Sequence, residues 1–444
     1  MTKPRFFGTD GIRGRFGRPP LDEMTVRRLG AALPDILKRT AAAPLVVLGG
    51  DTRDSTPTLC SWLAGELKAQ GVAVSYLGTM TTPGVTATVR RLGAAAGIAV
   101  SASHNPYPDN GIKLIDADGF KWTPEAEAEL ESLMDDAQPA GGEHLPEVDH
   151  GSVDAYLDSL AASLDGRRLG GMKIVLDAGF GAASPFAARL FSRLGADVTV
   201  LHDTPDGRNI NLDAGSTHPQ ALCAYVAAHG ADLGVAFDGD ADRAVLVDET
   251  GELKDGDAIL FLWGLDLRER GELRGNALVA TSMSNLGLQV ALGRHDIELR
   301  RCGVGDREVV ATMREGDLVL GGEQSGHVVN LGLSTTGDGL LTALQMADIV
   351  ARRGRPLSEL LAELQRFPQL LRNLPVSRKP DLDSLPEVVS AAAEVDAELG
   401  EQGRLVLRYS GTEDLVRIMI EGPDRDTIEG LADRLADVLV AAVG

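Results

Sequence analysis

Cysteine and aromatic residues are scarce in this chain of 444 residues. The three cysteines, Cys60, Cys223 and Cys302, lie far apart and form no Cys-x-x-Cys pair, which argues against a disulfide framework or a thiolate zinc site. No run of about 18 apolar residues occurs, and the first residues lack the apolar stretch of a signal peptide. We therefore expect a cytoplasmic protein that is neither inserted in a membrane nor exported by that route.

Positive charge is also in short supply. Lysine and arginine together number 43 against 65 aspartates and glutamates, which gives a formal net charge of -22. Such a balance repels nucleic acid and anionic membranes, so we expect neither as a partner. An acidic protein binds an anionic substrate only where basic residues gather locally. The positions of individual arginines and lysines are therefore informative.

Short apolar runs alternate with helical stretches along most of the chain. Hydrophobic residues make up 43% of the sequence, and its length predicts three or four domains. Three successive groups share one order, in which the third apolar run opens into a polar loop. The runs lie at 44–49, 72–76 and 96–100; at 173–177, 197–201 and 232–237; and at 277–281, 298–301 and 317–320. This order predicts α/β units with buried, largely parallel strands, whose carboxyl ends carry the ligand-binding loops.

Segments rich in proline and glycine mark the divisions. The segment 138–151 follows the first group, a turn at 249–252 lies near the start of the third, and 367–386 contains four prolines. After it come strand-like runs at 404–409 and 415–421 and an amphipathic helix from about Asp424. We predict three similar α/β domains and a smaller α+β domain around a central cleft. The predicted boundaries are 1–148, 149–252, 253–367 and 368–444.

The first polar loop contains Ser103 in Ser101-Ala-Ser-His-Asn-Pro106. A serine after a strand is commonly a cap or turn residue. Here Pro106 and Gly111 fix an irregular loop that can hold the hydroxyl away from backbone partners, and Lys113 follows. The Gly-x-Ser-x-Gly elbow of serine hydrolases is absent. A hydroxyl that accepts phosphate needs positive charge and a metal more than an acyl-transfer triad, so this loop favours phosphoryl transfer.

The second loop is Asp238-Gly-Asp240-Ala-Asp242-Arg243. Aspartates at alternate positions of an extended segment point the same way and can converge on one cation. A calcium loop of EF-hand type is rejected, because its sixth position holds Arg243 instead of glycine and the flanks read as strands. A solvated acidic turn is the alternative. Three hard oxygen ligands with room for a phosphate oxygen favour magnesium over zinc.

The third loop is Gly321-Gly-Glu323-Gln-Ser325-Gly-His327. Glu323 and Ser325 can exchange hydrogen bonds with sugar hydroxyls, and His327 can exchange protons near neutral pH. A glycine-rich turn with a hydrogen-bonded histidine is the competing interpretation.

The fourth loop is Arg408-Tyr-Ser-Gly-Thr-Glu413, with Arg417 on the next strand. Its backbone N–H groups, hydroxyls and guanidinium groups suit a phosphate nest, although a hairpin turn explains the pattern as well. The P-loop pattern is absent. Near the amino terminus, Arg13 stands between glycines and is either part of a plain loop or a further phosphate contact.

Together and in this order, the four loops resemble those of the α-D-phosphohexomutase superfamily, with one motif in each domain and a match over essentially the whole chain. The segments 7–14, 206–211 and 215–218, with Gln324, resemble the bacterial members that act on glucosamine phosphate. One departure is Asp414, where the family commonly has proline.

The resemblance implies a role for each motif. Ser103 becomes a phosphoserine, and Mg²⁺ is held by that phosphoserine with Asp238, Asp240 and Asp242. Arg13 and Arg243 contact the reacting phosphate, with Lys113 and His104 as candidates for proton transfer. The sugar is bound by Glu323, Ser325 and His327, and the non-reacting phosphate by Arg408, Ser410, Gly411, Thr412 and Arg417.

The implied activity interconverts glucosamine 6-phosphate and glucosamine 1-phosphate through a bound 1,6-bisphosphate, and supplies amino-sugar nucleotides for cell-wall precursors. Three alternatives stay open: the same chemistry on glucose or mannose phosphates, a metal-dependent sugar phosphatase, and a phosphosugar sensor without catalysis. The sequence does not fix which of Lys113, His104 and His327 is the acid or base, the resting phosphorylation of Ser103, or whether the chain forms a homodimer.

Overall fold

The computed structural model describes residues 5–400, 403–410 and 414–444. These residues form two compact units. The first unit comprises Met1–Ser282 and Arg300–Leu361, and the second comprises Met283–Leu299 and Ala362–Gly444. Within the described ranges, no helix has both the length and the apolar content that crossing a bilayer requires.

Both units are built from strands and helices in alternation. The strands are β1 (Phe7–Gly8), β2 (Gly11–Arg15), β3 (Leu45–Gly50), β4 (Ala73–Thr79), β5 (Ala96–Val100), β6 (Asp109–Asp116), β7 (Lys173–Asp177), β8 (Asp197–Leu201), β9 (Leu233–Phe237), β10 (Ala244–Val247), β11 (Leu253–Lys254), β12 (Ala277–Thr281), β13 (Glu298–Cys302), β14 (Leu320–Gly322), β15 (Val328–Asn330), β16 (Gln369–Pro375), β17 (Arg404–Tyr409) and β18 (Leu415–Glu421). The α-helices are α1 (Glu23–Leu37), α2 (Thr56–Ala69), α3 (Thr82–Leu92), α4 (Pro124–Asp136), α5 (His150–Ala162), α6 (Ala187–Arg193), α7 (Gln220–His229), α8 (Gly256–Glu269), α9 (Leu286–Gly293), α10 (Asp306–Glu315), α11 (Gly339–Arg353), α12 (Leu357–Leu360), α13 (Pro386–Leu399) and α14 (Arg425–Val443).

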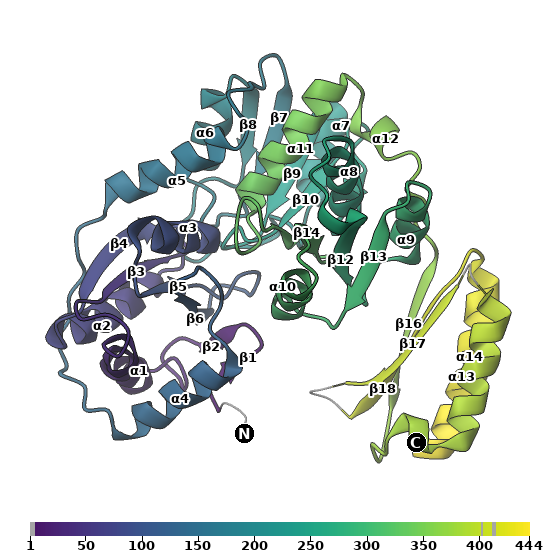
Figure 1. Cartoon of the computed structure of the whole chain (residues 1–444), viewed down its shortest axis with the longest axis horizontal. Helices are drawn as coiled ribbons and strands as arrows, with labels where there is room; N and C mark the ends of the chain where they lie inside the picture. The colour runs from purple at the N-terminus through teal and green to yellow at the C-terminus, as the bar shows by residue number, and fades with distance from the viewer. Residues whose placement is uncertain (1–4, 401–402, 411–413) are drawn as a thin grey trace. The chain divides into compact units, whose positions relative to one another are not determined.

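The first sheet has the order β1-β2-β6-β5-β3-β4, and β3 runs parallel to both β4 and β5. Helices α1, α2 and α4 cover one face and α3 covers the other (Figure 1). Side chains alternate accordingly: Leu48 and Ile98 join the core formed with α1 and α2, whereas Gly49 and Gly97 face Val85 of α3. All five residues of β5 are buried, as a strand covered on both faces requires.

The second and third sheets repeat this plan. In the second sheet, β7 pairs in parallel with β8 and β9, and β9 then turns back antiparallel into β10. In the third sheet, β12 pairs in parallel with β14, which turns back into β15. In the first sheet the equivalent turn joins β5 to antiparallel β6. The three polar loops of the first unit therefore occupy equivalent positions, each at the carboxyl end of a central strand.

The predicted α/β class and its element order are confirmed, although the sheets are mixed. The antiparallel strands β1, β2, β6, β11 and β15 were not expected as sheet members. β14 begins at Leu320 rather than at Asp317, and Asp317 itself adopts a left-handed φ of 48° that a strand does not accommodate.

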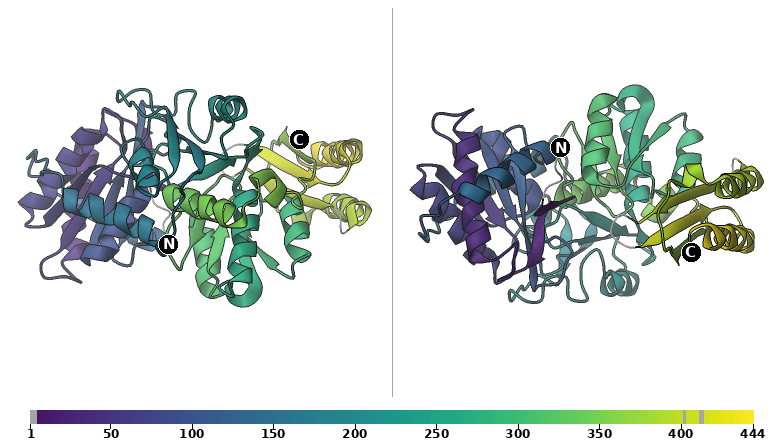
Figure 2. Two further views of the ribbon diagram at one scale, coloured as in Figure 1. Left: turned by 90° about the horizontal axis from the view of Figure 1, so that it is seen from above. Right: turned by 90° about the horizontal axis from the view of Figure 1, so that it is seen from below.

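The second unit contains the antiparallel sheet β16-β18-β17, with α13 and α14 side by side on one face (Figures 1 and 2). Ile428, Leu431, Leu435 and Leu439 of α14 recur at helical spacing and are buried in its core. The sequence predicted β17, β18 and α14, and Asp424 caps α14. It missed β16 and α13, which lie in or just after the proline-rich segment.

Candidate active site

The loop between β5 and β6 presents the hydroxyl of Ser103 to the aspartate-rich turn. Ser103 adopts a left-handed φ of 52°, and its N–H donates to Ser101 Oγ at 2.9 Å. Its own hydroxyl donates to Asp238 Oδ2 at 2.5 Å. His104 Nδ1 lies 3.4 Å from the same hydroxyl oxygen. A serine held in an unfavourable backbone conformation with its hydroxyl directed at a carboxylate 135 residues away is arranged for a purpose other than capping.

Arg53 holds this loop in place, a role that the sequence analysis missed. Its fully buried guanidinium donates to the carbonyls of Pro106 at 2.7 Å, Asn105 at 2.8 Å and Ser103 at 3.1 Å. It also pairs with Asp51 at 2.9 Å. Ser103 and the guanidinium are both buried, so the planar fork of arginine satisfies polar groups that would otherwise be costly to bury. No local signal in the sequence indicated this role, because the carbonyls that Arg53 reaches belong to a distant part of the chain.

The aspartates meet in a tight turn and not in the extended segment predicted. Ala241 has a φ of 54°, which turns the chain sharply between Asp240 and Asp242. The three carboxylates nevertheless each offer an oxygen, all within 4.8 Å of one another. Asp240 Oδ1 and Asp242 Oδ1 are buried and have no hydrogen-bond partner. Converging hard oxygens with unsatisfied lone pairs fit Mg²⁺.

The charges in this turn are crowded. Burial, with the neighbouring Asp242 and Asp240, raises the pKa of Asp238 well above its usual range. Burial acts in the same direction on Asp242, but Lys113, His327 and Arg243 outweigh it and hold the pKa of Asp242 well below its usual range. A cation bound among these carboxylates would reduce the electrostatic repulsion between Asp238 and Asp242.

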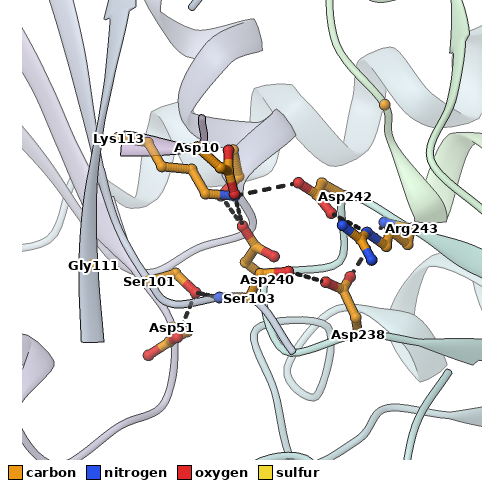
Figure 3. Close-up of polar contacts among 12 residues, drawn as sticks. Asp10, Asp51, Ser101, Ser103, Gly111, Lys113, Asp238, Asp240, Asp242 and Arg243 are labelled. Carbon is orange, nitrogen blue, oxygen red and sulfur yellow. Dashed lines mark hydrogen bonds and ion pairs between the residues drawn. The ribbon is translucent and has the colours of Figure 1, made fainter. Parts of the chain in front are cut away.

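Lys113, on β6, lies among three carboxylates (Figure 3). Its Nζ is 2.8 Å from Asp240 Oδ2 and 3.3 Å from oxygens of both Asp242 and Asp10. Burial alone would lower the pKa of Lys113, but these carboxylates raise it well above its usual value. Lys113 is therefore a fixed positive charge beside the aspartate turn.

The two histidines differ from each other. Burial and the nearby Arg243 and Arg13 lower the pKa of His104. Burial also acts to lower the pKa of His327, but Asp242 and Asp306 outweigh it and raise that pKa. The pKa values of the two histidines are therefore shifted in opposite directions, which separates two of the acid–base candidates; His327 Nε2 also accepts the N–H of Gly337 at 3.2 Å.

A cavity of about 460 Å³ lies beside these groups. Arg13 is anchored there by its Nη1, which donates to Asn105 Oδ1 at 3.2 Å. Ser325 is not part of the lining, and its hydroxyl donates to Glu323 Oε2 at 3.2 Å. Asp10 and Asp306, which the sequence analysis missed, do line it. The predicted site residues in the lining are Arg13, His104, Asp242, Arg243, Glu323 and His327.

The predicted phosphate loop belongs to the second unit. Arg408 and Arg417 are paired across β17 and β18, and Arg417 Nη2 donates to Ser410 Oγ at 3.4 Å. Asp414 forms an ion pair with Lys379 at 3.2 Å, which offsets the extra carboxylate at this position. Gly411 and Thr412 lie outside the described residues. Phosphate binding by this loop stays a prediction.

Comparison with known proteins assigns the class. Four family models match the chain in order: phosphoglucomutase/phosphomannomutase α/β/α domain I at 4–140, domain II at 154–251, domain III at 255–367 and the C-terminal domain at 371–438. The chain belongs to this family. The predicted boundaries at 148, 252 and 367 stay predictions.

Two relatives and one solved structure are similar to this chain over nearly its whole length. Phosphoglucosamine mutase of Symbiobacterium thermophilum is 45% identical over 98% of this chain and 99% of its own length. The enzyme of the same name from Geobacillus kaustophilus is 43% identical over 99% of each. A phosphoglucomutase/phosphomannomutase family protein from Burkholderia thailandensis shares the fold with a TM-score of 0.80 and 25% identity, covering 100% of this chain and 98% of that one.

Proposed function

We propose that the chain is a phosphohexomutase that interconverts glucosamine 6-phosphate and glucosamine 1-phosphate through a phosphoserine at position 103. The observation that carries this proposal is the contact between Ser103 Oγ and Asp238 Oδ2, which joins a hydroxyl to a turn suited to Mg²⁺. The relatives that match the chain over nearly its full length and are named phosphoglucosamine mutase support the amino sugar as the substrate.

The proposed reaction has two phosphoryl transfers. In the first, the O1 hydroxyl of glucosamine 6-phosphate attacks the phosphoserine, the P–Oγ bond breaks and the substrate proton passes to a base. The bound 1,6-bisphosphate then turns. In the second, Ser103 Oγ attacks the 6-phosphate, the P–O6 bond breaks and O6 takes a proton, which leaves glucosamine 1-phosphate and phosphoserine. No phosphoryl group is gained or lost over the two transfers.

The residues of the site have separate tasks in this scheme. Mg²⁺, held by the aspartate turn and a phosphoserine oxygen, would neutralise charge on the transferring group. Lys113 and Arg243 add fixed positive charge, because both side chains lie against the aspartates. The neutral form favoured for His104, 3.4 Å from Ser103 Oγ, suits it to accept a proton.

The remaining predicted site residues would bind the substrate. Arg13 would contact the reacting phosphate, and Glu323, Ser325 and His327 would bind the sugar. The fourth loop would hold the phosphate that is not reacting. We also propose that the 1,6-bisphosphate activates the dephosphorylated protein, that the enzyme works in the cytoplasm to supply cell-wall precursor synthesis, and that it forms a homodimer.

Ser103→Ala tests the proposal directly. We expect isomerisation to fall to background and the phosphate mapped to residue 103 by intact-mass and peptide analysis to disappear, with the fold unchanged by circular dichroism. Ser132→Ala removes a hydroxyl from the exposed face of α4 and serves as the matched control. Substantial isomerisation by Ser103→Ala would remove this serine from the mechanism. Release of free phosphate by the wild type without isomer formation would show a phosphatase instead.

A further inference from the structure

Three carboxylates outside the aspartate turn line the cavity: Asp10, Asp306 and Glu323. A site for a sugar phosphate gains nothing from extra negative charge, because the phosphate is itself an anion near neutral pH. Carboxylates are useful there if the substrate also carries a positive group. Glucosamine phosphate differs from glucose and mannose phosphates in that respect, since it has an ammonium group at C2.

The charge of Asp10 is already compensated. Its carboxylate contacts Arg13, Lys113 and Lys121, three cations on one acid. Although burial acts in the opposite direction, Lys113, Lys121 and Arg13 hold the pKa of Asp10 well below its usual range. Asp10 therefore has little attraction left for a further ammonium group.

Glu323 is engaged as a hydrogen-bond acceptor. Its Oε1 accepts the N–H of Gly305 at 3.1 Å, and its Oε2 accepts the hydroxyl of Ser325 at 3.2 Å. The contact from Gly305 also ties the segment before α10 to residues 321–327, the sugar loop, so Asp306, the next residue, lies beside that loop. His327 Nε2 is 3.8 Å from Asp306 Oδ2, which places the same carboxylate against the other end of the loop.

Asp306 is the carboxylate in the cavity that can still pair with a further ammonium group. Its side chain is 14% exposed, and Lys121, which it shares with Asp10, is its one lysine or arginine ion-pair partner among the described residues. Its Oδ1 accepts the N–H of Arg307 at 2.8 Å, so each oxygen keeps a lone pair for a further donor. The contact with Lys121 shows that this carboxylate accepts a primary ammonium group.

We infer that Asp306 selects the amino sugar by pairing with the C2 ammonium of the substrate. On a hexose ring, C2 is adjacent to C3, so a sugar whose ring hydroxyls contact the loop with Glu323 and His327 brings its C2 substituent close to the neighbouring Asp306. This inference rests on the proposed function. It assigns the specificity for the amino sugar to a residue outside the aspartate turn and the sugar loop.

Asp306→Asn removes the charge while keeping the shape. We expect kcat/KM for glucosamine 6-phosphate to fall by about 10- to 100-fold, the usual worth of a hydrogen bond between charged groups, and kcat/KM for glucose 6-phosphate to change by less than about threefold. Glu308→Gln, an exposed carboxylate two residues along α10, is the matched control and should leave the ratio of the two values unchanged. An equal loss on both substrates, or an unchanged ratio, would overturn the inference.

The wild-type protein supplies a second measurement that does not depend on a variant's folding. The ratio of kcat/KM for glucosamine 6-phosphate to that for glucose 6-phosphate should fall as the pH is raised and the substrate amine loses its proton, because effects of pH on the enzyme largely cancel in the ratio. A ratio that stays constant would refute the pairing. A wild-type protein that does not isomerise glucosamine 6-phosphate at all would instead refute the proposed function.

Discussion

Asp338 makes the stability of the first unit depend on pH in an unusual direction. It caps α11, where its Oδ1 accepts the N–H of Leu341 at 3.0 Å and its Oδ2 accepts the hydroxyl of Tyr156 at 2.9 Å. Burial raises the pKa of Asp338 to about 6, against an ordinary value of 3.8. Asp338 has no ion pair with a cation among the described residues, so nothing of opposite charge offsets the burial.

The direction and size of the effect follow from this shift. Because the pKa is higher in the folded than in the unfolded protein, the folded protein binds more protons between about pH 4 and 6. The contribution of Asp338 to the free energy of unfolding is therefore greatest below pH 4, falls as the pH rises through this window, and is constant above it. A difference of about two pKa units corresponds to about 3 kcal/mol.

Asp338→Asn removes the titration and keeps an acceptor for Leu341. Urea unfolding of variant and wild type can be followed by tryptophan fluorescence, which reports on the first unit because Trp62, Trp122 and Trp263 all lie in it. Between pH 4 and 6.5, the difference in unfolding free energy should shift in favour of the variant by up to about 3 kcal/mol. A difference that does not change with pH would refute this account of Asp338.

Two further variants test the residues that hold the Ser103 loop and the proposed metal. Arg53→Lys keeps the charge but loses the fork that reaches the carbonyls of Ser103, Asn105 and Pro106, so the free energy of unfolding should fall by about 2–4 kcal/mol and kcat should fall with it; unchanged values would show that the loop does not depend on this arginine. Asp240→Asn should weaken Mn²⁺ binding, measured by electron paramagnetic resonance on the protein without substrate, by about 10-fold or more, and an unchanged affinity would place the metal elsewhere.

The sequence predicted what short-range patterns encode. The buried apolar run 96–100 became a strand with those bounds, because a strand covered on both faces is apolar throughout. The run 173–177 also became a strand with its predicted bounds, with a buried apolar centre between Lys173 and Asp177. The polar loops that follow buried strands were recognisable because the composition changes there from apolar to polar residues. β16 escaped prediction because its residues are only partly buried and proline stands at its end.

Contacts between distant residues were not predictable in the same way. Nothing local to Arg53 indicates that it reaches three carbonyls some 50 residues away, and nothing near Lys121 indicates that it joins Asp10 to Asp306. The alternation rule brought the aspartates together for the wrong reason, because the left-handed Ala241 forms a turn that the rule does not anticipate. Such features depend on tertiary packing, which composition and periodicity do not specify.

The backbone of the aspartate turn limits how the site can move. The carbonyl of Asp240 accepts the N–H of Thr82, and that of Ala241 accepts the N–H of Gly339 at 2.9 Å. Thr82 begins α3 beside the first sheet and Gly339 begins α11, so elements from both sides hold the turn that faces Ser103. Separating them would leave buried carbonyls without donors, at about 1–3 kcal/mol each. Ser103 and the aspartate turn therefore stay together, and in the proposed reaction the reorientation of the substrate would have to come from changes in other contacts.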